Sequence, residues 1–257
     1  MHRFFVPQKN IGKKMIEITD MRHVHQIRNV LRMKIGDQFC VFAEEGQEYL
    51  VELAMEQQSG FVAKILDQKE KFSRGASALD AISVPELTLY MGLLKKDKFE
   101  WVLEKGTEIG VNRFVPLITD HTIKRVNKIP ARWQIIVEEA TEQCGRTRIP
   151  ILCEPALMSD MLEKNMNFIS QDEDSHQKDM LHFFFHPQAE ENFSLKFCNG
   201  LKKYGIWIGP EGGFSRRELD WARKQGFLVL SLGTSILRAE TAAIVFSAHL
   251  QFLSQQL

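Results

Sequence analysis

Two glycine-rich segments near the end of the chain have the residue types of a ligand site. In the first, residues 207–218 (WIGPEGGFSRRE), an apolar strand leads directly into a glycine-rich loop, and Ser215 with Glu218 has the pattern of a capping box for the next helix. Glycines at the carboxyl end of a strand let the backbone approach a ligand closely, at the edge where open α/β sheets bind ligands. The loop matches neither G-x-G-x-x-G nor G-x-x-x-x-G-K-[ST], and Glu211 places a carboxylate where a phosphate would have to lie. These features disfavour a dinucleotide or a nucleoside triphosphate, and the alternative to a ligand loop is a tight strand-to-helix turn.

The second segment, residues 230–243 (LSLGTSILRAETAA), also leads from a strand that ends at a glycine, through a short loop, into an apolar helix. Arg238, Glu240 and Thr241 are polar residues at the start of this helix. An arginine is rarely buried without a partner or a function. Arg238 is therefore a candidate functional residue. The alternative is an ion pair with Glu240 or Glu211 that ties the two loops together.

The first 72 residues are predicted to form a small β-barrel that includes one helix. The helix is expected from Asp20, a plausible N-cap, to about Met33, with Val24, Ile27, Val30 and Leu31 at helical spacing. The strands are expected at residues 2–6, 15–18, 38–42, 49–53 and 61–66. Residues 73–85 are small, polar and aperiodic, which is typical of a linker.

From residue 86 to residue 257, strand-like and helical stretches alternate, which predicts a second domain with a mostly parallel sheet covered on both faces. Strands are expected at residues 87–94, 113–118, 182–186, 205–208 and 227–232, and helices at 98–109, 130–144, 216–225 and 238–254. The fold class is thus α/β. Residues 165–179 are polar and acidic and are predicted to form an exposed loop.

Composition and charge disfavour several classes of protein. The 257 residues hold 33 basic and 33 acidic side chains, so a nonspecific nucleic-acid coat is disfavoured. Residues 1–34 nevertheless carry eight Lys or Arg against two acidic residues, a local patch that suits a polyanion. There is no apolar run of the ~18–20 residues that span a bilayer and no signal-peptide pattern, so we expect a cytoplasmic protein without membrane contact. The four cysteines are widely spaced and form no C-x-x-C pair, which predicts reduced thiols and no metal site.

The motifs together, in order and spacing, resemble the bacterial ribosomal RNA small subunit methyltransferase E family of the SPOUT superfamily. The resemblance covers nearly the whole chain, and His121 departs from it by standing where the family usually has an arginine. The matching segments are Arg3-Phe4-Phe5-Val6, His25-x4-Val30-Leu31-Arg32-x3-Gly36-Asp37, residues 96–98, 104–111 and 132–133, Glu139-Ala140-x2-Gln143-x2-Arg146-x3-Pro150, residues 209–214 and residues 232–242.

The resemblance implies an S-adenosylmethionine-dependent enzyme that methylates N3 of a uridine in 16S rRNA of the 30S subunit and releases S-adenosylhomocysteine. It also implies a PUA-like N-terminal barrel, a deep trefoil knot in the C-terminal domain, and a homodimer. Arg238 would be the catalytic cation that stabilises negative charge on the uracil oxygens. Glu211 and Glu240 are candidate general bases, or residues that only orient Arg238. The implied cofactor-binding residues are His186, Gly209, Pro210, Glu211, Gly212, Leu232, Gly233, Ile236, Leu237 and Arg238.

Basic side chains on both domains are the expected RNA contacts, because phosphate contacts position a nucleic acid. They are Arg3, Arg22, Arg28, Arg32 and Lys34 on the first domain, and Lys95, Lys96, Arg132 and Arg146 on the second. His25 either contacts RNA or is structural. Two other functions stay open: a SPOUT methyltransferase for another RNA nucleotide, and a non-catalytic RNA-binding protein. The intact GPEGGF and ILRAET segments argue against the second.

Overall fold

The computed structural model describes residues 1–44, 46–69, 85–123, 126–164, 180–193, 203–231, 233 and 235–253. The chain divides into two compact units, Met1–Leu79 with Glu138–Ile149 and Asp80–Val137 with Pro150–Leu257, here called the first and second units. The division runs through helix α3 (Ala131–Cys144), so the first unit takes a segment from the middle of the chain. The expected acidic loop at 165–179 and nearly all of the expected linker at 73–85 lie outside the described residues.

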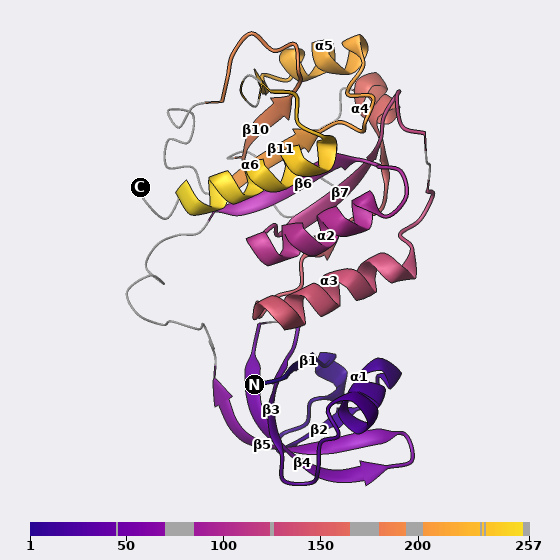
Figure 1. The fold of residues 1–257 in the computed structure, drawn as a ribbon, viewed down its shortest axis with the longest axis vertical. Helices are drawn as coiled ribbons and strands as arrows, with labels where there is room; N and C mark the ends of the chain where they lie inside the picture. The colour runs from indigo at the N-terminus through magenta and orange to yellow at the C-terminus, as the bar shows by residue number, and fades with distance from the viewer. Residues whose placement is uncertain are drawn as a thin grey trace. The chain divides into compact units, whose positions relative to one another are not determined.

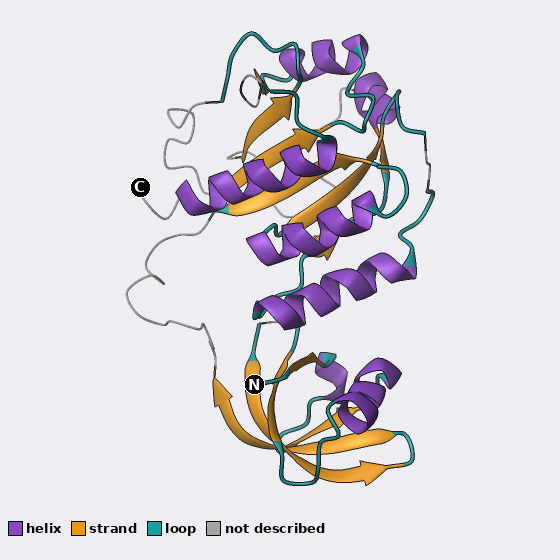
Figure 2. Ribbon diagram, in the orientation of Figure 1, coloured by secondary structure: helices purple, strands orange, loops and turns teal. Residues whose placement is uncertain are grey.

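The first unit is built on a curled five-stranded sheet with the order β1-β3-β4-β5-β2 (Figures 1 and 2). Only β1 and β3 pair in parallel, and the other neighbours are antiparallel. Alternating apolar residues such as Phe4, Ile16 and Phe39 form its buried core. The strands are β1 (Arg3–Phe5), β2 (Met15–Ile18), β3 (Gln38–Phe42), β4 (Glu48–Gln57) and β5 (Gly60–Lys69), with a 3-10 turn at Gln8–Asn10.

The helix of the first unit is shorter than predicted. Asp20 is its N-cap, as expected, and accepts a hydrogen bond from the Arg22 N–H at 2.8 Å. After α1 (Met21–His25) the chain widens into a π-helical turn at Gln26–Val30, in which the Leu31 N–H bonds to the Gln26 carbonyl. The wider turn rotates Val30 away from the core, and its side chain is 63% exposed. The prediction of Val30 on the buried face was therefore wrong.

The second unit contains a seven-stranded parallel sheet, with the path β12-β10-β11-β6-β7-β8 and β9 paired to β7. The register aligns the carboxyl ends of four neighbouring strands, so that Leu230, Phe185, Ile208 and Met91 lie in a row across the sheet. The strands are β6 (Glu86–Gly92), β7 (Arg113–Ile118), β8 (Ile151–Leu152), β9 (Ala156–Leu157), β10 (Met180–Phe185), β11 (Lys203–Ile208) and β12 (Leu228–Leu230).

Helices cover both faces of this sheet, as the alternating pattern predicted. On one face α2 and α6 pack side by side (Figure 1). Phe246 of α6 contacts Phe183 and Phe185. On the other face α4 and α5 bury a cluster that includes Phe184 and Trp207. The helices of this unit are α2 (Lys98–Ile109), α4 (Met158–Lys164), α5 (Arg216–Lys224) and α6 (Ala239–Leu253), with the first part of α3. Among the described residues no helix is long and apolar enough to cross a membrane.

A partly buried histidine is held in place on β10 by its neighbours in the sheet. His182 lies beside Gly205 on the neighbouring strand, and a side chain at that glycine would collide with the imidazole. Its Nδ1 accepts a hydrogen bond from the Trp207 indole N–H at 3.0 Å, and its ring stacks on Phe227. Since an indole can only donate, Nδ1 must be unprotonated. Burial lowers the pKa of His182 from 6.5 to about 4.

This environment predicts a pH-dependent stability of the second unit. A lowered folded-state pKa means that the contribution of His182 is complete above pH 6.5 and is lost as the pH falls toward 4, by about 3 kcal/mol. His182→Gln keeps an acceptor for Trp207 but does not titrate, so its free energy of unfolding should fall less than that of the parent between pH 6.5 and 4. Urea unfolding followed by tryptophan fluorescence reports on this unit, which contains all four tryptophans. Equal pH slopes for the two proteins would contradict the assignment.

Candidate functional site

A cavity of about 660 Å³ opens at the carboxyl edge of the parallel sheet, where β10, β11 and β12 end. It is formed by three loops that follow these strands and by the start of α6. Its lining comprises Lys98, Phe185, His186, Pro187, Ile208, Gly209, Pro210, Glu211, Gly213, Ser231, Gly233, Ser235, Ile236, Leu237, Arg238, Ala239, Glu240 and Ala242. The lining combines apolar walls with a few charged groups, which is the usual make-up of a small-molecule site.

Glycines allow the strand end and the first loop to approach each other. A Cβ built on Gly92, at the end of β6, would lie 2.9 Å from the carbonyl carbon of Gly209 and closer still to the ring nitrogen of Pro210. A Cβ on Gly209 would lie 2.9 Å from the carbonyl carbon of Gly213. Backbone atoms therefore fill the space that a side chain would need at Gly92 and at Gly209. The loop at residues 209–214 is here called the GPEGG loop.

A second set of contacts holds the GPEGG loop from the chain that follows β7. Ser215 and Glu218 form the predicted capping box of α5, and the buried Glu218 also accepts the Asp120 N–H at 2.9 Å. His121 Nδ1 lies 3.0 Å from the Gly212 carbonyl and 3.2 Å from the Gly213 carbonyl, so it must carry the proton and donate. The histidine that departs from the family pattern thus has a structural role in this chain.

Most of the predicted cofactor residues come together at the cavity. Eight of the ten line it: His186, Gly209, Pro210, Glu211, Gly233, Ile236, Leu237 and Arg238. Gly212 is not among the lining residues, because its side faces His121, where a Cβ would lie 2.9 Å from the His121 Cβ. Leu232 lies outside the described residues. The sequence reasoning missed Lys98 as a lining residue, although it belongs to a matched segment, since nothing in the sequence relates the start of α2 to that of α6.

Two carboxylates and two cations mark the polar side of the cavity. Lys98 Nζ lies 3.0 Å from Glu240 Oε1 and 3.9 Å from Glu211 Oε1, and Glu211 also accepts the Lys95 N–H at 3.1 Å. Burial by itself raises the pKa of Glu240, but its own backbone N–H, Lys98 and Arg238 outweigh this and lower the net pKa. Arg238 is exposed and forms no ion pair within 4.0 Å with any described residue. The expected Arg238–Glu240 and Arg238–Glu211 pairs are thus not formed.

His186, which follows β10, forms another part of the wall. Its Nδ1 accepts a hydrogen bond from the Gln188 N–H at 3.2 Å. Burial is the main cause of its lowered pKa; the backbone of Phe214 opposes this effect, while Arg223 and Arg216 add to it. The imidazole is therefore a neutral, partly apolar surface at pH 7.

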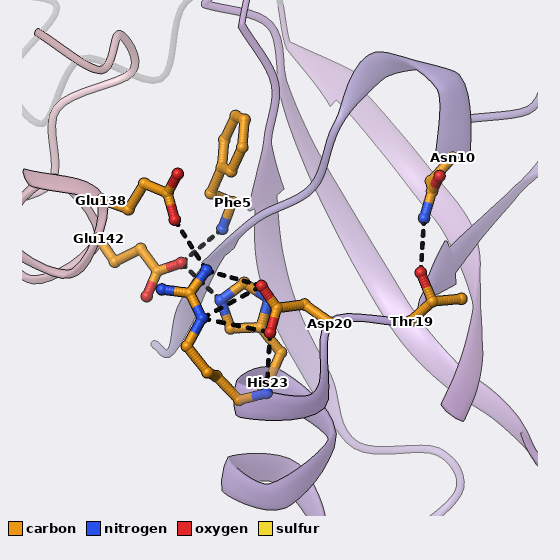
Figure 3. Close-up of polar contacts among 8 residues, drawn as sticks. Phe5, Asn10, Thr19, Asp20, His23, Glu138 and Glu142 are labelled. Atoms are coloured by element: carbon orange, nitrogen blue, oxygen red, sulfur yellow. Dashed lines mark hydrogen bonds and ion pairs between the residues drawn. The ribbon is translucent and has the colours of Figure 1, made fainter. Parts of the chain in front are cut away.

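Several of the basic residues predicted to contact RNA form ion pairs within the protein. The Arg22 guanidinium lies 2.6 Å from the Asp20 carboxylate and 2.7 Å from the Glu138 carboxylate. Figure 3 shows these two carboxylates on either side of one guanidinium. Arg3 forms an ion pair with the fully buried Glu48 and donates to the Arg146 carbonyl. In the same cluster Glu142 accepts from the Phe5 N–H and lies 2.9 Å from His23 Nε2. These contacts fasten the end of α3 to the sheet of the first unit.

The other basic candidates fall into two groups. Arg28 pairs with Glu56 at 2.6 Å and lies over the Phe61 ring, Arg132 pairs with Glu100 at 2.6 Å, and burial lowers the pKa of Arg146. The second group is exposed and forms no side-chain ion pair within the described part of the chain. It comprises Arg32, Lys34, Lys95 and Lys96. The described residues also contain no group of three or more His, Cys, Asp or Glu that could hold a metal ion.

Two family models match separate parts of this chain. A family model described as "RNA methyltransferase domain" matches residues 82–251, and one described as "RNA methyltransferase PUA domain" matches residues 18–66. A ribosomal RNA small subunit methyltransferase E from Rickettsia conorii is 30% identical over 255 residues, which cover 98% of this chain and 96% of the relative. The chain belongs to the ribosomal RNA small subunit methyltransferase E family. A member from Bacillus subtilis is 28% identical to this chain, over 100% of this chain and 98% of the relative.

Solved structures of this family share the fold. The methyltransferase E of Neisseria gonorrhoeae, bound to S-adenosyl methionine, superposes with a TM-score of 0.80 at 26% identity and covers 98% of both chains. A Legionella pneumophila protein solved with the same cofactor bound superposes with a TM-score of 0.79 at 27% identity, over 98% of this chain and 97% of the other chain. The expected α/β fold with a mostly parallel sheet and a PUA domain at the N-terminus is thereby confirmed.

Basic residues with acidic partners and exposed basic residues without them should have different mutant phenotypes. Arg3→Met removes the guanidinium that pairs with buried Glu48 and should lower the free energy of unfolding by about 3–5 kcal/mol. Lys34→Met, at an exposed position in the same unit, should change it by no more than about 0.5 kcal/mol. Denaturation monitored by circular dichroism measures both. Similar stabilities would show that Arg3 is a surface contact rather than part of the core of this unit.

Proposed function

We propose that this protein is an S-adenosylmethionine-dependent methyltransferase that modifies N3 of a uridine in 16S rRNA of the small ribosomal subunit. The observation that carries the proposal is the cavity at the carboxyl edge of the sheet, where the GPEGG loop meets the start of α6 and Arg238 has no acidic partner among the described residues. Family membership supplies the substrate class, and the chemistry of the cavity supports it.

The cavity fits the cofactor. Its volume lies within the roughly 300–1,000 Å³ of small-molecule sites, and its walls offer apolar surface from Ile208 and Leu237. Gly209, Gly213 and Gly233 line the cavity without side chains, so a ligand could approach the backbone of these loops closely, as an adenine and a ribose would. His186, Pro210, Glu211 and Ile236 complete the proposed binding wall. Gly212 and Leu232, included in the prediction from sequence, would contribute through the loops they belong to.

Arg238 would serve the acceptor. The bound cofactor supplies an electrophilic methyl group on a sulfonium sulfur. Uridine N3 would lose its proton to a base, and the resulting anion would share its negative charge with the two flanking carbonyl oxygens. The new N–C bond would then form as the methyl–sulfur bond breaks, and S-adenosylhomocysteine would leave. A guanidinium beside them lowers the barrier by roughly 2.7–4 kcal/mol. Glu240 is poorly suited to hold the N3 proton, because its lowered pKa makes it a weak base near neutral pH.

The exposed cations would contact the rRNA backbone. Arg32 and Lys34 on the first unit and Lys95 and Lys96 on the second are the strongest candidates, since they carry charge without an ion pair among the described residues. Such contacts position the RNA, while the target base supplies specificity once it is flipped out of its stack. The deep trefoil knot and the homodimer implied by the family resemblance belong to the same proposal.

Loss of Arg238 should separate chemistry from cofactor binding. We expect Arg238→Ala to lower methyl transfer to 16S rRNA in 30S particles at least ~100-fold, because the charge on the uracil oxygens is no longer stabilised. The dissociation constant for S-adenosylmethionine, measured by calorimetry, should change little. Arg217→Ala, an exposed arginine outside the cavity, is the matched control and should retain activity. Unchanged turnover in Arg238→Ala would remove this residue from the mechanism.

Gly92→Ala, unlike Arg238→Ala, should weaken the binding of S-adenosylmethionine. The added methyl group collides with the backbone of the GPEGG loop and displaces it. We expect the affinity for S-adenosylmethionine to fall at least about tenfold, equivalent to ~1.4 kcal/mol. Met91→Leu, one residue earlier and similar in volume to the parent, should bind normally. Parent-like binding by Gly92→Ala in calorimetry would argue against a cofactor held by this loop.

A further inference from the structure

Lys98 lies beside Glu240 and Glu211, the two carboxylates that could otherwise form an ion pair with Arg238. Glu240 is only two residues from Arg238, and the two are close enough for Arg238 to lower the pKa of Glu240. Glu211 lines the same cavity. Yet Lys98 Nζ lies 3.0 Å from Glu240 and 3.9 Å from Glu211, while no described carboxylate lies within 4.0 Å of the Arg238 guanidinium.

Three segments place Lys98 there. Lys98 is the first residue of α2 and Glu240 is the second residue of α6, and these helices pack side by side. The turn before α2 also donates the Lys95 N–H to Glu211, which directs this carboxylate toward Lys98. The Glu240 side chain is only 13% exposed, so its charge needs a partner more than a surface carboxylate would.

We propose that Lys98 is a positioning residue that keeps Arg238 available to the substrate by holding Glu240 and Glu211. Without Lys98, the two carboxylates would be left to the nearest remaining cation. Arginine is a strong competitor, because its planar guanidinium can bind a carboxylate through two parallel hydrogen bonds. An Arg238 captured in this way could not stabilise charge on the uracil oxygens. The proposal rests on the methyltransferase function and on the role of Arg238 in it.

The contrasting interpretation is that the Lys98–Glu240 pair merely ties α2 to α6. The two interpretations differ in what they predict for a second substitution. If the pair is only a tie, removing Glu240 as well as Lys98 cannot help catalysis. If Lys98 shields Arg238, removing Glu240 also removes the carboxylate that captures the arginine, and activity should recover.

The test is a double-mutant experiment on the full-length protein. We expect Lys98→Met to lower kcat for rRNA methylation by between about 10- and 100-fold, with the dissociation constant for S-adenosylmethionine changed less than about threefold. Adding Glu240→Gln should restore at least half of the loss on a logarithmic scale. Lys98→Arg, which keeps a cation at the same place, should retain most of the activity. An unchanged kcat in Lys98→Met, or no recovery in the double variant, would overturn the proposal.

A crystal structure of Lys98→Met gives a readout independent of activity. The proposal predicts an Arg238–Glu240 ion pair shorter than 4.0 Å that is absent from the parent protein. An unpaired Arg238 in this variant would contradict it even if activity were low. Conversely, if the parent protein did not methylate rRNA, the proposed function would fail, while the structure of the variant would still decide whether Lys98 keeps Arg238 free.

Discussion

The candidate site depends on the contact between the end of β6 and the peptide that joins Gly209 to Pro210. No side chain fits at Gly92, so the backbone of one strand end lies directly against the loop that follows the neighbouring strand. The aligned register of β6, β11, β10 and β12 brings the other loops to the same edge. The cavity is therefore made largely of backbone and of residues that immediately follow strands.

Polar contacts hold the GPEGG loop in place at this edge of the sheet. Glu218 completes the capping box of α5 and bonds to the chain after β7, and His121 donates to the carbonyls of the GPEGG loop. On the opposite side of the loop, Lys98 and the Lys95 N–H hold Glu211. The loop thus has partners from two elements distant in sequence, which keeps its backbone groups in a fixed arrangement for a ligand.

Much of this could be predicted from sequence, because the strongest signals were local. The strand-loop-helix patterns located the GPEGG loop, the capping box and the start of α6, and period-2 and helical spacing identified most strands and helices to within a few residues.

Contacts between residues distant in sequence could not be predicted in this way. The ion pairs of Arg3 and Arg22 could not be predicted, because their partners, Glu48 and Glu138, are 45 and 116 residues away. Lys98 was missed as a lining residue for the same reason. The exposure of Val30 could not be predicted because helical spacing assumes α-helical hydrogen bonds, whereas the chain here forms a π-helical one. The short β8, β9 and α4 have too few residues to show a period.

The central claim is that this cavity directs methyl transfer to N3 of a uridine in 16S rRNA. The most direct measurement is mass spectrometry of nucleosides from 30S subunits that lack the modification, after incubation with the protein and S-adenosylmethionine carrying a labelled methyl group. The account predicts labelled 3-methyluridine in 16S rRNA. A different labelled nucleoside, or label confined to another RNA, would contradict it.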